Sequence, residues 1–392
     1  MDLTKNKRGT ASVWGGETNL FEHGATTPPV VNSVTFAYDD LDEWFDVAVG
    51  KRDGHIYSRN TNPTVQVLEE KIRVMEYAEA ATSFATGMAA ISNTLFTLLS
   101  PGDRVVSIND SYGGTSKIFL EHLPRFNVDV QLCETTNHEQ IETEISKGCK
   151  VVYLETPTNP TLKILDLKRL IKAAKQAGAI VVVDNTFATP INQTPILLGA
   201  DLVVHSATKF LSGHSDVMGG LICGKEELVK KVFHYREING ASLNPASAYM
   251  IIRGMKTLEL RVLRQNDNAL NIAKFLQDHK SVKEVFYPGL ESHPGHAIAA
   301  SQMSGFGGVL SFSLNGGFDE VKQFLTKLKF VHLAASLGSV STLAGPPKTT
   351  SHVEMTEAQR KQLGIPEGLV RYSVGIENVE DLIEDLNEAL FK

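Results

Sequence analysis

The sequence predicts an α/β protein in which a three-layer domain with a mostly parallel sheet is followed by a smaller α+β domain. Between about residues 80 and 224, short β-rich runs bounded by Gly, Pro or Asp alternate with segments of helical periodicity, which is typical of βαβ units. After about residue 258 the pattern changes to helix, strand, strand, helix. The 392 residues and the hydrophobic content of 42% allow more than one core, because a domain usually holds roughly 100 to 200 residues.

The individual elements follow from the spacing of apolar residues and turn formers. A helix is expected at 167–176, because Leu167, Leu170, Ile171 and Ala174 fall on one face at spacings of three and four. A last helix is expected after Asn378, a residue type that caps helix N-termini, before the periodic residues Val379, Leu382, Ile383, Leu386 and Leu390. Strands are expected at 103–109, 129–133, 151–155, 180–184, 202–205 and 221–223.

The first part of the chain differs from the rest. The runs TTPPVVNSV and GKRDGHIYSRNTNPT have turn chemistry and little periodicity, so they cannot form a core alone. We therefore divide the chain into an arm at 1–59, expected to contact a neighbouring subunit, a large α/β domain at 60–257 and a C-terminal α+β domain at 258–392.

The composition of the chain limits the kinds of molecule that it is expected to bind. The chain has 38 Lys and Arg against 45 Asp and Glu, a net charge of −7 without long like-charge runs, which argues against a nucleic-acid binder. The three cysteines show no CxxC spacing, so neither a disulfide framework nor a zinc ribbon is expected. No signal peptide and no membrane span are visible. We expect a cytoplasmic protein with small-molecule partners.

Two residues near strand ends, taken together, indicate one kind of chemistry. Lys209 follows the apolar strand that ends near His205, and Asp184 ends the strand before it. The carboxyl ends of parallel strands meet at one edge of the sheet, where ligands bind. A lysine that forms a Schiff base, opposite an aspartate that pairs with a pyridinium nitrogen, is what pyridoxal phosphate requires. Each residue alone could equally be a surface lysine in a salt bridge or a helix-capping aspartate.

A phosphate group would need donors near these strand ends. The segment from Ser83 to Met88 precedes an apolar helix, and a turn at Gly87 would aim backbone amides at an anion. Ser206 and Thr208 add hydroxyl groups, and Tyr112 could lay its ring on a planar cofactor. Taken singly, Gly87 is an ordinary turn glycine and Tyr112 a packing residue.

Three other patterns do not support a site. The run GGLICGK at 219–225 resembles a phosphate-binding loop, but Glu226 replaces the Ser or Thr that would bind magnesium. The SxxK pattern at 206–209 resembles the motif of penicillin-binding enzymes, in which the serine is acylated. The KTG motif that accompanies it in those enzymes is absent from the sequence. His205, His214, His293 and His296 lack the spacing of metal ligands, so we expect solvated or capping histidines and no metal.

Together, the motifs resemble the pyridoxal-phosphate-dependent Cys/Met metabolism family over nearly the whole chain. The family landmarks occur in order as YSRNTNPT (57–64), SFATGMAA (83–90), SYGGT (111–115), ETPTNPT (155–161), VVDNTFATP (182–190), HSATKFLSGHSD (205–216), ASLGS (335–339) and GLVRYSVGIE (368–377). The resemblance implies the aspartate-aminotransferase-like fold (fold type I), with a seven-stranded, mostly parallel sheet and helices on both faces. It also implies a homotetramer, a dimer of dimers with active sites shared between two subunits.

The resemblance also implies roles for individual residues. Lys209 resembles the lysine that holds pyridoxal 5'-phosphate covalently and then moves protons, and Tyr112 resembles the stacking aromatic and a second acid or base. Asp184 resembles the partner of the pyridine nitrogen. The phosphate cradle would be Gly87, Met88, Ser206 and Thr208, completed by Tyr57 and Arg59 from a neighbouring subunit. Asn159, Ser336 and Arg371 resemble the residues that bind the substrate carboxylate.

The implied activity is trans-sulfuration at Cγ of L-homoserine-derived amino acids. We expect cystathionine γ-synthase activity, which joins an O-acylhomoserine and L-cysteine, with cystathionine γ-lyase or O-acylhomoserine sulfhydrylase as alternatives. The methionine γ-lyases carry a cysteine where this chain has Gly114, which disfavours that activity. Ile56 and Ala335 replace acidic residues usual in γ-synthases and γ-lyases, which favours a sulfhydrylase as a rival. A non-enzyme alternative is a catalytically silent scaffold of the same fold.

Overall fold

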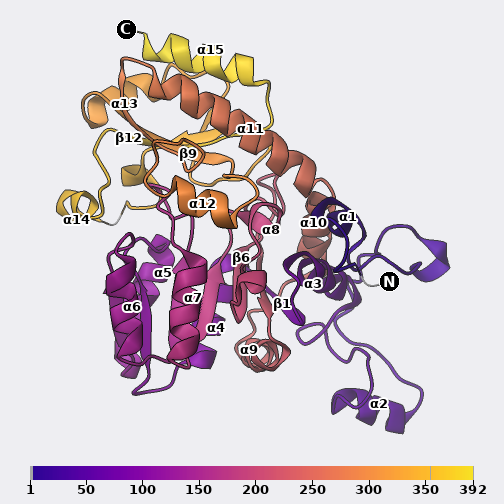
Figure 1. Cartoon of the computed structure of the whole chain (residues 1–392). Coiled ribbons are helices and arrows are strands. Elements are labelled where there is room, and N and C mark those ends of the chain that lie inside the picture. The colour runs from indigo at the N-terminus through magenta and orange to yellow at the C-terminus, as the bar shows by residue number, and fades with distance from the viewer. Residues whose placement is uncertain (1–2, 354, 392) are drawn as a thin grey trace.

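The computed structural model describes residues 3–353 and 355–391. Its named strands form one sheet of seven strands and one of five. Figure 1 shows the C-terminal sheet and its helices stacked above the larger sheet, with the N-terminal segments to one side. Within the described ranges, no helix is both long and apolar enough to cross a membrane.

The larger sheet has the order β1-β7-β6-β5-β4-β2-β3. Its strands are β1 (Ala80–Phe84), β2 (Arg104–Ile108), β3 (Asp129–Cys133), β4 (Val151–Glu155), β5 (Ile180–Asp184), β6 (Leu202–Ser206) and β7 (Gly220–Gly224). The strands from β3 through β2, β4 and β5 to β6 are parallel, whereas β7 is antiparallel to both β6 and β1. The predicted mostly parallel, seven-stranded sheet is confirmed. The strand β1 was not predicted from the sequence.

Both faces of this sheet are covered by helices, because successive strand residues point to opposite sides. On β4, Val151 and Tyr153 pack in one core, and Val152 and Leu154 pack in the other. The helices of this region are α3 (Pro63–Glu76), α4 (Gly87–Leu98), α5 (Gly113–Lys117), α6 (His138–Ser146), α7 (Leu167–Gln176), α8 (Thr189–Asn192), α9 (Glu226–Asn239) and α10 (Pro245–Met255). The predicted helix at 167–176 is confirmed, and its four apolar residues are buried.

The C-terminal region contains more elements than the sequence predicts. They are α11 (Leu258–Gln277), β8 (Val282–Phe286), α12 (His296–Gln302), β9 (Val309–Leu314), α13 (Phe318–Leu325), β10 (His332–Leu333), β11 (Leu343–Gly345), α14 (Glu357–Gln362), β12 (Leu369–Ser373) and α15 (Val379–Leu390). The expected order of helix, strand, strand, helix was therefore too simple, because strands of two or three residues leave no periodic pattern. Asn378 does lie at the N-cap of α15, but its side chain makes no capping bond. Its Oδ1 accepts a hydrogen bond from Arg264 instead, at 3.3 Å.

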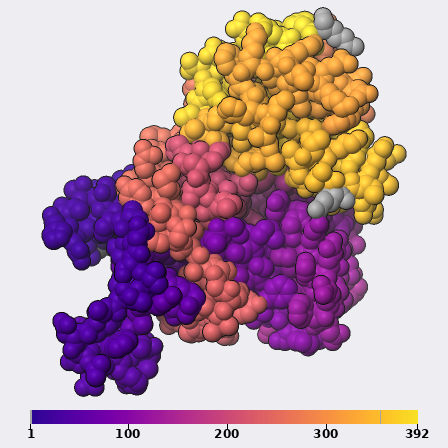
Figure 2. Space-filling model, turned by 180° about the vertical axis from the view of Figure 1, so that it is seen from behind, coloured from indigo at the N-terminus to yellow at the C-terminus, as the bar shows by residue number. Residues whose placement is uncertain are grey.

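The N-terminal segment contains two helices, α1 (Arg8–Trp14) and α2 (Leu41–Ala48), where the sequence predicts irregular chain. Figure 2 shows this segment projecting from one side of the body. Its first part is fastened by a buried ion-pair cluster, in which Lys71 Nζ lies 3.0 Å from Glu17 Oε1 and Lys256 Nζ lies 2.5 Å from Glu17 Oε2. The domain boundaries and the contact of the arm with another subunit stay predictions.

Candidate active site

The carboxyl ends of the parallel strands open into a cavity of about 300 Å³ beneath the C-terminal region. Ten of the twelve predicted site residues line it, and they come from both halves of the chain. They are Gly87, Met88, Tyr112, Asn159, Asp184, Ser206, Thr208, Lys209, Ser336 and Arg371. Residues up to 284 positions apart in the sequence (371 minus 87) therefore meet at one place.

Part of the cavity is lined by residues at the N-terminus of α4. The first N–H groups of a helix have no intrahelical acceptor and attract anions. A Cβ atom on Gly87 would lie 2.8 Å from Cβ and 2.9 Å from Oγ of Ser206, so only glycine leaves this space open. Within the described chain, the Ser206 hydroxyl has no hydrogen-bond partner. The hydroxyl of Thr208 is already engaged, because its Oγ1 accepts a hydrogen bond from the Gly219 N–H at 3.0 Å.

Lys209 lies past the end of β6 and points into the cavity. Its Nζ donates a hydrogen bond to Ser336 Oγ at 2.9 Å. Burial, and secondarily the positive charge of Arg371, lowers the pKa of Lys209 to about 8. A lysine with a lowered pKa is more often neutral near physiological pH, and a neutral amine is the form that attacks a carbonyl group.

Asp184 ends β5 and is buried, with donors on both carboxylate oxygens. Its Oδ1 accepts from the Thr186 N–H at 3.0 Å, and its Oδ2 accepts from the Tyr153 hydroxyl at 3.2 Å. Burial raises the pKa of Asp184, and the hydrogen bonds from Thr186 oppose that rise. A cationic ring nitrogen beside this carboxylate would compensate for its burial.

Arg371 on β12 is a buried cation whose partners in this chain are neutral. Its Nη1 donates to Asn159 Oδ1 at 3.0 Å, and its Nη2 donates to the Ser336 carbonyl oxygen at 2.8 Å. Burial lowers the pKa of Arg371 to about 10. No carboxylate of a described residue pairs with this guanidinium, and a planar guanidinium is suited to bidentate binding of a carboxylate. The site thus has a place for a substrate carboxylate.

Tyr112 is the N-cap residue of α5 and lines the cavity, with 43% of its surface exposed. A charged residue that was not predicted from the sequence, Glu155, lies nearby, and its Oε2 accepts a hydrogen bond from the Tyr112 N–H at 2.8 Å. Glu155 ends β4 just as Asp184 ends β5. The same strand-end argument that selects Asp184 could have selected Glu155.

Tyr57 and Arg59 do not join the cavity. Both are exposed on the arm, and the Arg59 guanidinium carbon lies 4.8 Å from the centre of the Tyr57 ring. Their expected function in a neighbouring subunit's site stays a prediction. The exposure leaves both side chains accessible to another molecule.

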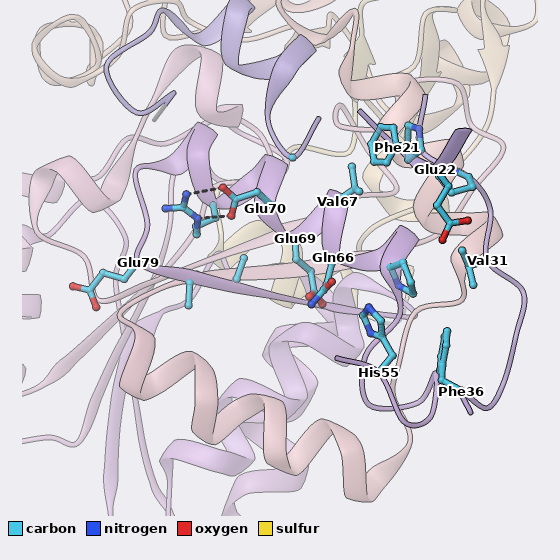
Figure 3. A pocket seen from close by; sticks show the side chains of 17 residues that line it. Phe21, Glu22, Val31, Phe36, His55, Gln66, Val67, Glu69, Glu70 and Glu79 are labelled. Carbon is cyan, nitrogen blue, oxygen red and sulfur yellow. Dashed lines mark hydrogen bonds and ion pairs between the residues drawn. The ribbon is translucent and has the colours of Figure 1, made fainter. Parts of the chain in front are cut away.

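A second, larger hollow of about 1000 Å³ lies between the arm, α3 and β1, and contains none of the predicted site residues (Figure 3). Two of its acidic side chains, Glu69 and Glu70, already have partners. Glu70 binds Arg73 through two hydrogen bonds of 2.6 Å, and Glu69 accepts from the Ser83 N–H at 2.9 Å. The chemistry of this hollow does not match that of the cavity at Lys209.

Among the described residues, the histidines are not part of a possible metal site. In the part of the chain that the structure describes, no cluster of three or more His, Cys, Asp or Glu residues could hold a metal ion. The expectation of solvated or capping histidines is wrong for His205, which is buried and whose Nε2 lies 2.7 Å from Glu76 Oε1. A buried carboxylate needs a partner, and His205 supplies one to Glu76.

Comparison with known proteins agrees with this geometry. Residues 9–391 match the family described as Cys/Met metabolism PLP-dependent enzyme. The chain is 44% identical to the L-methionine gamma-lyase of Fusobacterium nucleatum subsp. polymorphum, over 100% of both chains. It is 41% identical to the cystathionine gamma-lyase of Bacillus subtilis (strain 168), over 98% of this chain and 99% of that protein. A crystal structure of cystathionine gamma synthase from Xanthomonas oryzae pv. oryzae, in complex with aminoacrylate and cysteine, matches with a TM-score of 0.93 at 38% identity, covering 98% of this chain and 97% of that chain.

Proposed function

Because the chain belongs to the Cys/Met metabolism PLP-dependent enzyme family, we propose that it catalyses trans-sulfuration at Cγ of L-homoserine-derived amino acids. The reaction proposed first is that of a cystathionine γ-synthase, in which L-cysteine replaces the acyl group of an O-acylhomoserine to give L-cystathionine. Solved structures of that enzyme type are among those similar to this chain. The observation that carries the proposal is the convergence of Lys209, Asp184 and Arg371 on one cavity.

The residues of the cavity fit pyridoxal 5'-phosphate, the cofactor of the family. The space beside Gly87 and the free Ser206 hydroxyl would hold the phosphate, and Asp184 would hold the ring nitrogen in its protonated form. Tyr112 would lie against the ring, and Lys209 would hold the cofactor covalently. When bound, pyridoxal 5'-phosphate accepts the electron pair left at carbon when a proton is removed.

The side chains then divide the work on the substrate. Arg371, with Asn159, would bind the substrate carboxylate and so orient Cα toward Lys209. The neutral amine of Lys209 would take the proton from Cα and move it onward. Tyr112 would serve as an acid or base at the γ-substituent. Each general acid or base of this kind raises the reaction rate about 10²- to 10⁴-fold when its geometry is held.

A second candidate function is γ-elimination from L-methionine, and one observation favours it. The charged side chains that line the cavity are Glu155, Asp184, Lys209 and Arg371. The remaining outer wall, which includes Met88, Ala335, Thr350 and Ser351, is uncharged. An uncharged wall is compatible with a small uncharged γ-substituent such as a thiomethyl group. The 44% identical relative named L-methionine gamma-lyase agrees with this candidate.

Product analysis on purified holoenzyme tests both functions. O-acetyl- and O-succinyl-homoserine are supplied with and without L-cysteine or sulfide, and L-methionine and L-cystathionine are supplied alone. We expect cysteine-dependent L-cystathionine as the main product. Faster release of 2-oxobutyrate and methanethiol from L-methionine would instead establish the second candidate. If sulfide gives homocysteine faster than L-cysteine gives L-cystathionine, the protein is a sulfhydrylase. If 2-oxobutyrate forms mainly from L-cystathionine, the protein is a γ-lyase.

A Lys209→Ala variant tests the proposed site independently of the substrate preference. Lys209→Ala should abolish all of these activities and prevent borohydride from fixing the cofactor to the chain. Wild-type turnover by a colourless Lys209→Ala variant would overturn the proposed site itself.

A further inference from the structure

Glu155 is a buried carboxyl group in the cavity to which the sequence analysis assigns no role. It ends β4 and is only 5% exposed. Its Cα is the register partner of the Cα of Asp184 on the neighbouring strand. Two carboxyl groups therefore lie side by side at the carboxyl edge of the sheet.

The main contact of Glu155 is with the backbone of Tyr112. Glu155 Oε2 accepts a hydrogen bond from the Tyr112 N–H at 2.8 Å, and the Tyr112 side chain makes no capping bond to α5. On the other side of this turn, a Cβ atom on Gly114 would lie 2.7 Å from Met88 Sδ. The turn that carries the Tyr112 ring is thus fixed between Glu155 and α4.

The surroundings of the two carboxyl groups indicate which one carries the negative charge. Asp184 receives hydrogen bonds from Thr186 and Tyr153, and His205 favours its charged form. Glu155 receives one bond, and the charge of Asp110 disfavours its charged form. Asp110 is itself paired with Lys163 at 3.0 Å. Burial and the charge of Asp184 raise the pKa of Glu155 well above its ordinary value. Like charges this close disfavour double ionisation, and the greater number of hydrogen bonds to Asp184 favours the negative charge there and the proton on Glu155.

We propose that Glu155, in its neutral form, is a positioning residue that fixes the backbone of Tyr112 and thereby holds the Tyr112 ring at the mouth of the cofactor site. The proposal rests on the proposed function, because it gives the Tyr112 ring a cofactor to lie against. A neutral carboxyl group suits this position, because its carbonyl oxygen still accepts the Tyr112 N–H while Asp184 keeps the only negative charge beside the ring nitrogen.

The test compares Glu155→Gln with Glu155→Ala, each in wild-type and Tyr112→Ala backgrounds. Affinity for pyridoxal 5'-phosphate is measured by equilibrium dialysis of the apo-protein, and the absorption band of the bound cofactor is recorded over pH 6 to 9. Thermal melts followed by circular dichroism establish that each variant is folded. We expect Glu155→Ala to weaken cofactor binding about tenfold, the effect of one lost hydrogen bond to a placed group. Glu155→Gln should restore most of that loss, because an amide carbonyl also accepts the Tyr112 N–H.

The double variant decides whether Glu155 acts through Tyr112. If it does, Glu155→Ala adds less than about threefold in the Tyr112→Ala background. A full tenfold addition there would overturn the proposal, and so would an equal loss in Glu155→Gln and Glu155→Ala. If Glu155→Ala does not fold, the Gln variant still decides, because a tenfold loss in that variant contradicts a neutral acceptor. Substrate identity does not enter these measurements, so they can fail while trans-sulfuration is retained.

Discussion

Lys209 brings an amino group into a cavity that already holds the buried guanidinium of Arg371. Removal from water disfavours the ammonium form, and the neighbouring positive charge disfavours it further. Both effects act in the same direction, so the pKa of Lys209 falls to about 8. The amine is therefore more available for carbonyl attack than an exposed lysine, whose ordinary pKa is about 10.4.

This shift predicts how the apo-protein takes up its cofactor as pH changes. The lowered pKa means that the neutral fraction of Lys209 rises about tenfold per pH unit below pH 8 and then levels off. We expect the second-order rate of pyridoxal 5'-phosphate uptake, followed by stopped-flow absorbance from pH 6 to 10, to show this profile. A free alkylamine measured in parallel corrects for ionisation of the cofactor.

Arg371→Met supplies the matched variant for that measurement. It removes the neighbouring positive charge, so it should raise the pKa of Lys209 and move the plateau to higher pH. The burial contribution would remain, so the plateau should stay below that of the free amine. A wild-type plateau near pH 10, or a profile that does not respond to Arg371→Met, would contradict this account.

The sequence could predict that some of these residues lie close together in the cavity, but not all of them. Lys209 and Asp184 follow strands that are neighbours in a parallel sheet, so local sequence and sheet topology suffice to bring them together. Arg371 lies on β12 of the other sheet, and only the family motifs indicate it. Tyr153 is buried inside β4 and donates to Asp184, yet in the sequence it reads as one more apolar strand residue.

At the scale of elements, the strands β2 to β7 of the larger sheet were predictable from the sequence, whereas β1 was not. The strands β2 to β6 are flanked by helices of regular period, whereas β1 follows α3 after three residues and pairs only with β7. Its polar Thr82 and Ser83 are buried by contacts with Glu69 and Arg236, so the run AATSF lacks an apolar pattern. The pairing of β7 against both β6 and β1 is a tertiary feature that no local signal carries.

The junction of β1 with α4 sets the clearest test at this scale. Gly87→Ala places a Cβ atom 2.8 Å from Cβ of Ser206, and overpacking of this kind costs about 1 to 3 kcal/mol. We expect cofactor affinity, measured by dialysis, to weaken about tenfold or more. Gly317→Ala is the control, because its Cβ would have no described atom nearer than Glu320 Oε2 at 4.0 Å. Equal cofactor affinity in Gly87→Ala and wild type would exclude the cradle.

At the scale of the whole molecule, the arm has a surface that the rest of its own chain does not cover. Figure 2 shows it extending away from the body, and it carries exposed apolar side chains, including Leu20, Leu41 and Phe45. Monomeric proteins rarely expose many large apolar residues together. The predicted assembly, with Tyr57 and Arg59 entering a neighbouring cavity, would bring this arm against another subunit. The irregular sequence of the arm predicts a contact with a neighbouring subunit, and the resemblance adds the entry of Tyr57 and Arg59 into that subunit's cavity.

Complementation between two defective variants tests the shared site directly. Lys209→Ala damages the cavity of its own subunit, and Arg59→Ala is expected to damage the cavity of the neighbour, chiefly by weaker cofactor retention. Each variant alone should therefore have little activity. In a hybrid dimer both defects fall on the same site, which leaves the other site intact. Random mixing makes about half of the dimers hybrid, so co-refolded protein should recover roughly a quarter of wild-type activity.

The control pair is Lys209→Ala with Asp184→Ala. Both residues line the cavity of one chain, so every site in the hybrid keeps one defect and no activity should return. Recovery in the first pair and not in the second would establish that the arm completes the neighbour's site. Failure of both pairs, with subunit exchange verified by differently sized tags, would mean that each cavity is complete within its own chain. The same measurement separates the two views of the arm, because the returning activity needs Lys209 from the Arg59→Ala subunit and Arg59 from its partner, and an arm that only stabilises an interface would not bring Arg59 into that site.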